Sequence, residues 1–127
     1  MEAKAVQAIV ERAATAWMTG DAAAFASLFT ADGECIVPGN RWVGQKAIAA
    51  ALAEFAAGHT NVKISVRQIV ADGDHAVVEW SWEDTETATG KRTVADDAIA
   101  VDFVRGQIRR WREYIDAQTP SRANGSN

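Results

Sequence analysis

Two acidic residues stand among large apolar residues in the last third of the chain, Asp97 and Glu113. In IRRWREYID, residues 108–116, Glu113 alternates with Trp111 and Ile115, so a β-strand would put all three side chains on one face. An unpaired buried carboxylate is costly, so it must be hydrogen-bonded, protonated or open to a water-filled pocket. A carboxyl group held among indoles suits general acid–base catalysis near neutrality.

The segments that carry both acids alternate apolar and polar residues, as half-buried strands do. Four such segments follow one another with short turns between them, at 62–66, 75–83, 96–104 and 107–115. They predict an antiparallel meander. Seven large apolar residues share the predicted inner face with the two acids: Val78, Trp80, Trp82, Ile99, Val101, Trp111 and Ile115. Structural alternatives for the acids are backbone capping, a buried arginine partner or, for Asp97, a place at the wet rim of the sheet.

The first 60 residues read as helices, because their apolar residues recur every three or four positions. The predicted elements are a first helix ended by Gly20, a second helix over 22–29 capped by Asp21, a strand over 35–37, a turn over 38–40 and a third helix over 45–57. Helices followed by sheet indicate an α+β fold, with three N-terminal helices packed on one face of a curved antiparallel sheet. Residues 1–118 are predicted to be one domain and 119–127 a flexible tail.

Composition excludes several classes of function. With 13 basic and 17 acidic residues spread along 127 positions, no basic patch for nucleic acid is expected. No apolar run approaches the roughly 18 residues that span a bilayer, and no secretory signal is recognisable at the N-terminus. One cysteine and two histidines argue against an intrachain disulfide or a metal centre and favour a cytoplasmic protein. Motifs for phosphate, dinucleotide or calcium binding are absent from the sequence, so no cofactor is expected.

Several other residues have a structural and a functional interpretation. Cys35 in a strand is expected to pack in the core, and a nucleophile is the alternative. His59 follows the predicted third helix and is expected on the surface, with the pocket mouth as the alternative. Trp42 lies on the loop before the predicted third helix. A sheet face rich in indoles favours a flat, apolar ligand.

Three segments carry a resemblance to a known family: GDAAAFASLFTADGE, RWVGQKAI and GQIRRWREYID. With them, residues 3 to 118 resemble the SnoaL-like polyketide cyclases of the nuclear transport factor 2-like superfamily, which includes ketosteroid isomerase and limonene epoxide hydrolase. The resemblance implies a cone-shaped α+β barrel, an apolar pocket between sheet and helices, and a homodimer through the outer sheet face. This fold hosts many activities, so the resemblance does not by itself assign one.

Catalytic residues of these relatives are mostly not matched. The resemblance puts the general base of ketosteroid isomerases at Val37 and their second acid at Ile99, and neither residue titrates. The epoxide hydrolase motifs fall on Trp80-Ser81-Trp82 and Cys35-Ile36-Val37, and only their last acid has a counterpart, Glu113. Cyclases use an inner-face acid as general base, and either Glu113 or Asp97 fits that role.

The sequence therefore predicts a site with Glu113 as base and Asp97 as its partner or acid. Predicted substrate contacts are Cys35, Val37, Trp42, Val78, Trp80, Trp82, Ile99, Val101, Trp111 and Ile115. No metal ligands are expected. One hypothesis is a cofactor-independent isomerase, cyclase or hydrolase acting on a small apolar cyclic molecule. The others are a pocket that binds a small molecule without turnover and a dimerisation domain.

Overall fold

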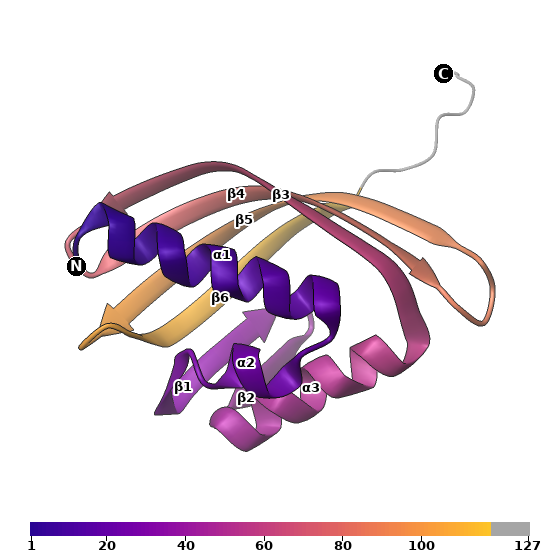
Figure 1. Ribbon diagram of the computed structural model, residues 1–127, viewed down its shortest axis with the longest axis horizontal. Helices are drawn as coiled ribbons and strands as arrows, with labels where there is room; N and C mark the ends of the chain where they lie inside the picture. The colour runs from indigo at the N-terminus through magenta and orange to yellow at the C-terminus, as the bar shows by residue number, and fades with distance from the viewer. Residues whose placement is uncertain (118–127) are drawn as a thin grey trace.

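The computed structural model describes residues 1–117, which form three helices and six strands. They are α1 (Ala3–Thr19), α2 (Ala22–Ala26), β1 (Phe29–Val37), β2 (Asn40–Val43), α3 (Gln45–Gly58), β3 (His59–Asp72), β4 (His75–Glu86), β5 (Arg92–Val104) and β6 (Gln107–Ala117). The helices lie on the concave side of a curved sheet, which confirms the predicted α+β fold (Figure 1). The predicted tail over 119–127 lies outside the described residues.

Helix boundaries follow the expected capping chemistry. Gly20 ends α1 in the left-handed conformation, with φ of 72°. The Asp21 carboxylate accepts the backbone N–H of Ala24 at 3.0 Å and so caps α2. The predicted second helix over 22–29 is too long, because the fully buried Phe29 already belongs to β1 and packs edge-on against Phe25.

The sheet has the strand order β2-β1-β6-β5-β4-β3. The predicted antiparallel meander is confirmed in β3 to β6, whose neighbours all pair antiparallel. At its other side β1 pairs with β6 in parallel, which makes the sheet mixed, and the sheet does not close on itself. As a result β6, the strand that carries Glu113, lies between two neighbours near the middle of the sheet.

The first half of the chain contains more strand than its sequence pattern predicts. The segment 31–34 lies inside β1, where Gly33 passes β6 so closely that a Cβ would come within 3.0 Å of the Ile108 carbonyl oxygen. Residues 40–43, which read as turn and loop, form β2. Strand β3 is much longer than the predicted segment 62–66. Register shifts along it interrupt the alternation of apolar and polar residues, so the sequence pattern indicates only part of the strand.

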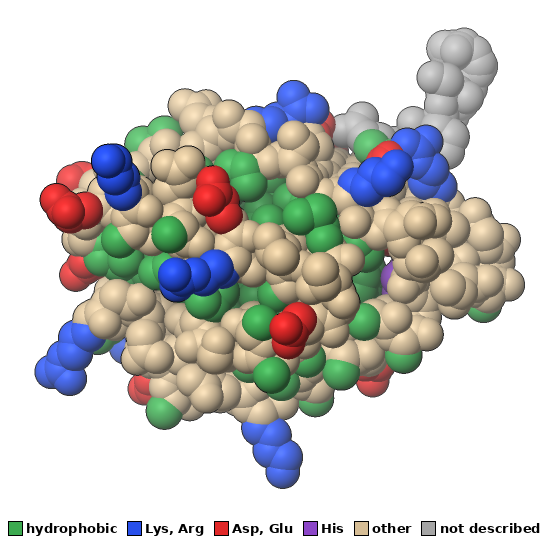
Figure 2. Space-filling model, viewed as in Figure 1, with side chains coloured by type: hydrophobic (Ala, Val, Ile, Leu, Met, Phe, Trp, Pro, Cys, Tyr) green, Lys and Arg blue, Asp and Glu red, His purple; other side chains and the backbone are tan. Residues whose placement is uncertain are grey.

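Side-chain parity correctly assigns the two faces of the meander. Trp80 and Trp111 are buried between sheet and helices, whereas Val77 and Tyr114, of opposite parity, are 49% and 53% exposed. Asp97 and Glu113 are buried with the tryptophans, at 5% and 8% exposure. On the surface seen in Figure 2, basic and acidic side chains are interspersed, with hydrophobic side chains showing between them.

Candidate functional site

A cavity of about 450 Å³ lies between the inner face of the sheet and the helices α1 and α3. It brings together six residues that the sequence predicts for the site: Val37, Trp42, Trp82, Asp97, Glu113 and Ile115. Six further polar or aromatic residues complete much of its wall: Trp17, Glu54, Phe55, His59, Asp84 and Thr93. The cavity is thus mostly aromatic, with carboxyl groups at several places.

The two predicted acids are diagonal neighbours on adjacent strands. Asp97 of β5 pairs with Ile115 of β6, and Glu113 comes two residues earlier on β6, on the same face. Each acid accepts an indole N–H: Trp111 donates to Glu113 Oε2 at 2.9 Å, and Trp80, opposite Asp97 on β4, donates to Asp97 Oδ2 at 3.1 Å. The buried indoles therefore hold both carboxyl groups at the edge of the cavity.

Burial and mutual contact shift the titration of this pair. Burial is the main cause that raises the pKa of Glu113 to about 8; a hydrogen bond with Asp97 and its negative charge add to the rise, and the Trp111 hydrogen bond opposes it. Burial also raises the pKa of Asp97, while hydrogen bonds from Glu113 and Trp80 favour its charged form. Asp97 Oδ1 is buried and accepts from no other group among residues 1–117, so a protonated Glu113 is its natural donor. At neutral pH a pKa of about 8 leaves a proton on Glu113, and the titration belongs to the pair.

A second acid-containing pair, Asp84 and His59, was not found from the sequence. Asp84 is 5% exposed, and its Oδ2 accepts the Trp82 indole N–H at 2.6 Å. His59 stacks on Phe55, with ring centroids 4.0 Å apart, and its Nδ1 lies 2.9 Å from the Phe55 carbonyl oxygen. Because a carbonyl only accepts, Nδ1 carries the proton of that bond. The expectation of a surface His59 is wrong, and its alternative at the pocket is confirmed.

Six of the predicted substrate contacts do not line this cavity: Cys35, Val78, Trp80, Ile99, Val101 and Trp111. They are buried in the core behind the cavity. Strand parity predicts which face of the sheet a residue lies on, but it does not predict how deeply the residue is buried. Burial, together with the nearby Glu113 charge, raises the pKa of the Cys35 thiol, so Cys35 remains a protonated core residue rather than a nucleophile. Trp80 and Trp111 act on the site through their indole N–H groups.

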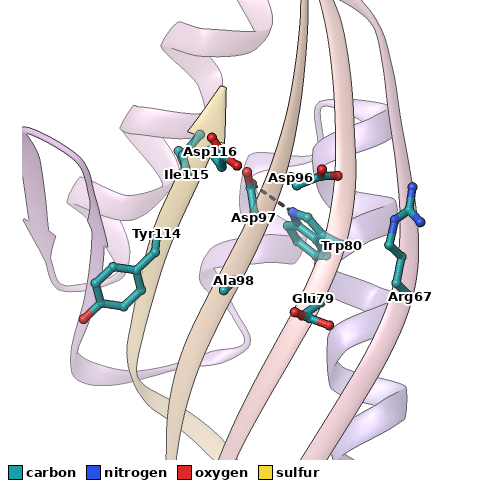
Figure 3. Close-up of a pocket in the computed structure, with 9 residues that line it drawn as sticks. All are labelled: Arg67, Glu79, Trp80, Asp96, Asp97, Ala98, Tyr114, Ile115 and Asp116. Carbon is teal, nitrogen blue, oxygen red and sulfur yellow. Dashed lines mark hydrogen bonds between the residues drawn. The ribbon is translucent and has the colours of Figure 1, made fainter. Parts of the chain in front are cut away.

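A wider depression of about 510 Å³ lies on the opposite face of the sheet (Figure 3). Its exposed side chains include Arg67, Glu79, Asp96 and Tyr114, which come from four adjacent strands. Figure 3 also shows the Trp80–Asp97 hydrogen bond at its edge, but Glu113 is not part of its lining. The inner cavity is therefore the candidate site, because it alone of these two holds the complete carboxyl pair.

Residues 1–117 contain no group of three or more histidine, cysteine, aspartate and glutamate side chains placed to hold a metal ion. Over the same residues, no helix has the length and apolar character needed to cross a bilayer.

Comparison with protein families identifies the fold family directly. The model of the SnoaL-like domain matches residues 10–111. The chain belongs to this family. The resemblance seen in the sequence is thereby confirmed, and so is the predicted fold class of this SnoaL-like domain.

Similar solved structures agree on the fold. A Catenulispora acidiphila protein of ketosteroid isomerase-like fold, in complex with trimethylamine, has a TM-score of 0.79 at 23% identity over 84% of this chain and 83% of that chain. TsrD from Streptomyces laurentii has a TM-score of 0.81 at 17% identity over 91% of each chain. An LEH-like epoxide hydrolase from M. tuberculosis has a TM-score of 0.75 at 20% identity over 88% of this chain and 82% of that chain. A comparison with curated proteins finds no match.

Proposed function

We propose that this SnoaL-like domain is a cofactor-independent enzyme that moves protons on a small, mostly apolar cyclic substrate, as an isomerase or cyclase. The observation that carries the proposal is the Asp97–Glu113 pair, two buried carboxyl groups on adjacent strands with raised pKa values at the wall of an aromatic cavity. Raised pKa values bring carboxyl groups into the range where they exchange protons efficiently near neutrality.

The pKa shifts favour Glu113 as the acid and Asp97 as the base, whereas the sequence predicts Glu113 as the base. Glu113, whose pKa is about 8, retains its proton at neutral pH and is the acid. Asp97 accepts the Trp80 N–H, and the contributions of Trp80 and Glu113 oppose the rise that burial causes in its pKa, so we assign Asp97 the role of base. Because the two groups share one proton, their titration belongs to the pair.

A proton transfer at carbon uses both roles. Asp97 removes a proton from a carbon next to a carbonyl, and the Glu113 proton passes to the carbonyl oxygen, giving an enol. Return of a proton from Asp97 to a different carbon of the conjugated system, with the enol proton returning to Glu113, completes an isomerisation. Alternatively, the same carbon attacks a second carbonyl of the substrate and closes a ring, while the proton on Asp97 passes to the oxygen of that second carbonyl and the enol proton returns to Glu113. In a hydrolase variant, Asp97 takes a proton from water while the water oxygen bonds to an electrophilic carbon, and Glu113 gives its proton to the oxygen that leaves this carbon.

Deuterium exchange tests the proposal without knowledge of the natural substrate. Wild-type protein in D2O is expected to exchange protons next to the carbonyl in a panel of cyclic ketones, followed by NMR. Amine-bearing ketones belong in the panel, since the similar Catenulispora acidiphila protein was crystallised with trimethylamine. Asp97→Asn should lower the exchange rate by roughly 100-fold or more, and Glu113→Gln should lower it as well. Absence of exchange in the wild type, or unchanged rates in both variants, contradicts the proposal.

Binding without turnover is the second candidate function. It is supported by Val37, an apolar residue of the cavity wall at the position that the family resemblance relates to a catalytic base. A binding protein would retain a small ligand unchanged, which native mass spectrometry after long incubation detects. Conversion of the ligand during that incubation rules this candidate out.

The predicted homodimer through the outer sheet face is kept as a further proposal. That face exposes the apolar side chains of Val70, Val77, Val104 and Tyr114, at 42% to 57% exposure. Burial of such residues favours association. Light scattering after size exclusion should give twice the chain mass, and Val77→Lys should shift the protein towards monomer. A monomeric wild type at all concentrations contradicts it.

A further inference from the structure

The cavity has a second polar end that the proposed proton transfer does not use. Along β4, Asp84 comes four residues after Trp80, the cross-strand partner of Asp97. At about 3.3 Å per residue, the two acids are separated by about 13 Å along the sheet. Asp84 lines the same cavity and is 5% exposed. A ligand whose reacting part lies at Asp97 can therefore reach Asp84 with another group.

Asp84 has a free acceptor atom at this end. Its Oδ2 accepts the Trp82 N–H, but its Oδ1 lies 4.0 Å from His59 Nε2, beyond hydrogen-bond distance. Among residues 1–117 no other donor reaches Oδ1 within hydrogen-bond distance. The protonated Nδ1 of His59 is directed to the Phe55 carbonyl instead. The only ion-pair partner of Oδ1 among residues 1–117 is thus the His59 imidazole at 4.0 Å, and this oxygen accepts no hydrogen bond from these residues. A buried carboxylate with such an oxygen at a cavity points to a ligand that carries a donor or a positive charge.

The wall of the cavity is predominantly acidic, which matches a positively charged ligand. Four acidic residues line the cavity, Glu54, Asp84, Asp97 and Glu113, and no lysine or arginine of residues 1–117 does. His59 is the basic residue of this wall. With Glu113 protonated, the carboxylates still outnumber a charged histidine. A cavity with apolar walls and charges of one sign focuses its field on the ligand.

Aromatic side chains surround the Asp84 end. Trp82 contacts Phe55 and Trp17 edge-on, with ring centroids 5.5 Å and 5.7 Å apart, and all three rings line the cavity. The negative faces of such rings attract organic ammonium groups, and their apolar surface buries alkyl substituents. A primary ammonium group, as in lysine, has three N–H donors that each need an acceptor, whereas a protonated tertiary amine has only one. The alkylated amine therefore fits this wall better.

We propose that the Asp84 end of the cavity binds a protonated tertiary amine of the substrate. Its N–H donates to Asp84 Oδ1, and its alkyl groups pack against Trp82 and Phe55. The proposal rests on the proposed function only in assigning this amine to the substrate whose carbonyl region lies at Asp97. The substrate class is then a small cyclic carbonyl compound that carries an alkylated amine.

Binding of two matched probes tests this. N,N-dimethylbenzylamine is a cation at neutral pH, and isobutylbenzene is its neutral isostere. Calorimetry or tryptophan fluorescence on the wild-type protein should show at least about tenfold tighter binding of the amine. Asp84→Asn should weaken amine binding by about tenfold and leave the isostere within about twofold. Glu54→Gln, the same charge change at an exposed position of the same cavity, should alter amine affinity by less than about threefold.

Equal affinity for amine and isostere overturns the inference, and so does an Asp84→Asn variant that binds the amine as tightly as the wild type. Should Asp84→Asn not fold, the wild-type comparison decides alone. The outcome is separable from that of the proposed function. Amine preference without deuterium exchange removes the catalytic proposal only, whereas exchange without amine preference removes only the amine site.

Discussion

Two strands of the sheet carry the same short pattern, a tryptophan followed two residues later by an acid. In β6 it is Trp111 and Glu113, and in β4 it is Trp82 and Asp84. In both, the indole N–H donates to the acid on the same face of the strand, at 2.9 Å and 2.6 Å. The local structure is thus the same, and the difference comes from the neighbours.

At the β6 pair the neighbouring strand contributes another acid, Asp97, while at the β4 pair the chain after α3 contributes His59. Two carboxyl groups in contact share a proton, which gives the β6 pair its acid–base character. A carboxylate near an imidazole and aromatic rings is instead suited to a cation. The same motif therefore has two chemistries, which are decided by what tertiary packing puts beside it.

The largest contrast between the pairs is expected in stability. Trp111 is fully buried, so Trp111→Ala should lower the free energy of unfolding by about 3 to 5 kcal/mol. Trp82 already borders a cavity, so Trp82→Ala should lower it by about 1 to 2 kcal/mol. Urea unfolding measures both, and equal losses would show that the two tryptophans are equivalent parts of the core.

The pH dependence of stability separates the two acids. Glu113 binds its proton up to about pH 8 when folded, against an ordinary pKa of 4.5, so the folded state holds the extra proton between these values. The stabilisation is complete below about pH 4.5 and is lost as the pH rises through 8. The free energy of unfolding should fall across this window by up to about 1.4 kcal/mol per pH unit.

Glu113→Gln should flatten this slope and leave stability unchanged or raised at pH 8, because no charge has to be buried. Asp84→Asn should retain the slope, since Glu113 is still present. Urea unfolding at a series of pH values compares the three proteins. A wild-type slope that survives in Glu113→Gln would assign the extra proton to another group.

The smallest effect is expected at the β4 pair. His59→Gln removes the ring stacked on Phe55, an interaction of about 0.5 to 1.5 kcal/mol, at a half-buried position. The free energy of unfolding should fall by about 1 kcal/mol, and deuterium exchange should be unchanged. A loss of exchange in this variant would connect the two ends of the cavity in the reaction.

Alternation along the strands was sufficient to predict the carboxyl pair. Trp111, Glu113 and Ile115 have one parity, and the same rule places Asp97 beside them, so the face followed from the order of residues alone. Burial depth did not follow, because it depends on the helices packed above. Ile99 and Val101 are therefore core residues, although they share the face of the acids.

The Asp84 end was missed at two element boundaries. Strand β4 was predicted to end at residue 83 and runs to Glu86, so the parity that already joined Trp80 and Trp82 was not extended to Asp84. The sequence pattern also predicts a surface position for His59 after the third helix, but β3 begins directly at this residue. For Asp84 the sequence does contain a signal, because a tryptophan stands two residues before this acid. The position of His59 depends on long-range packing that no local pattern carries.

Parallel pairing of β1 with β6 also has a kinetic consequence. The two strands come from opposite ends of the chain, and contacts between such distant segments form slowly because a long loop must first be closed. Glu113 lies on β6, and its register with β1 is fixed only when that closure occurs, whereas its register with β5 follows from the short turn that joins these two strands. During synthesis, the helices and the earlier strands of the sheet can assemble first, and the carboxyl pair is completed only after β6 has emerged.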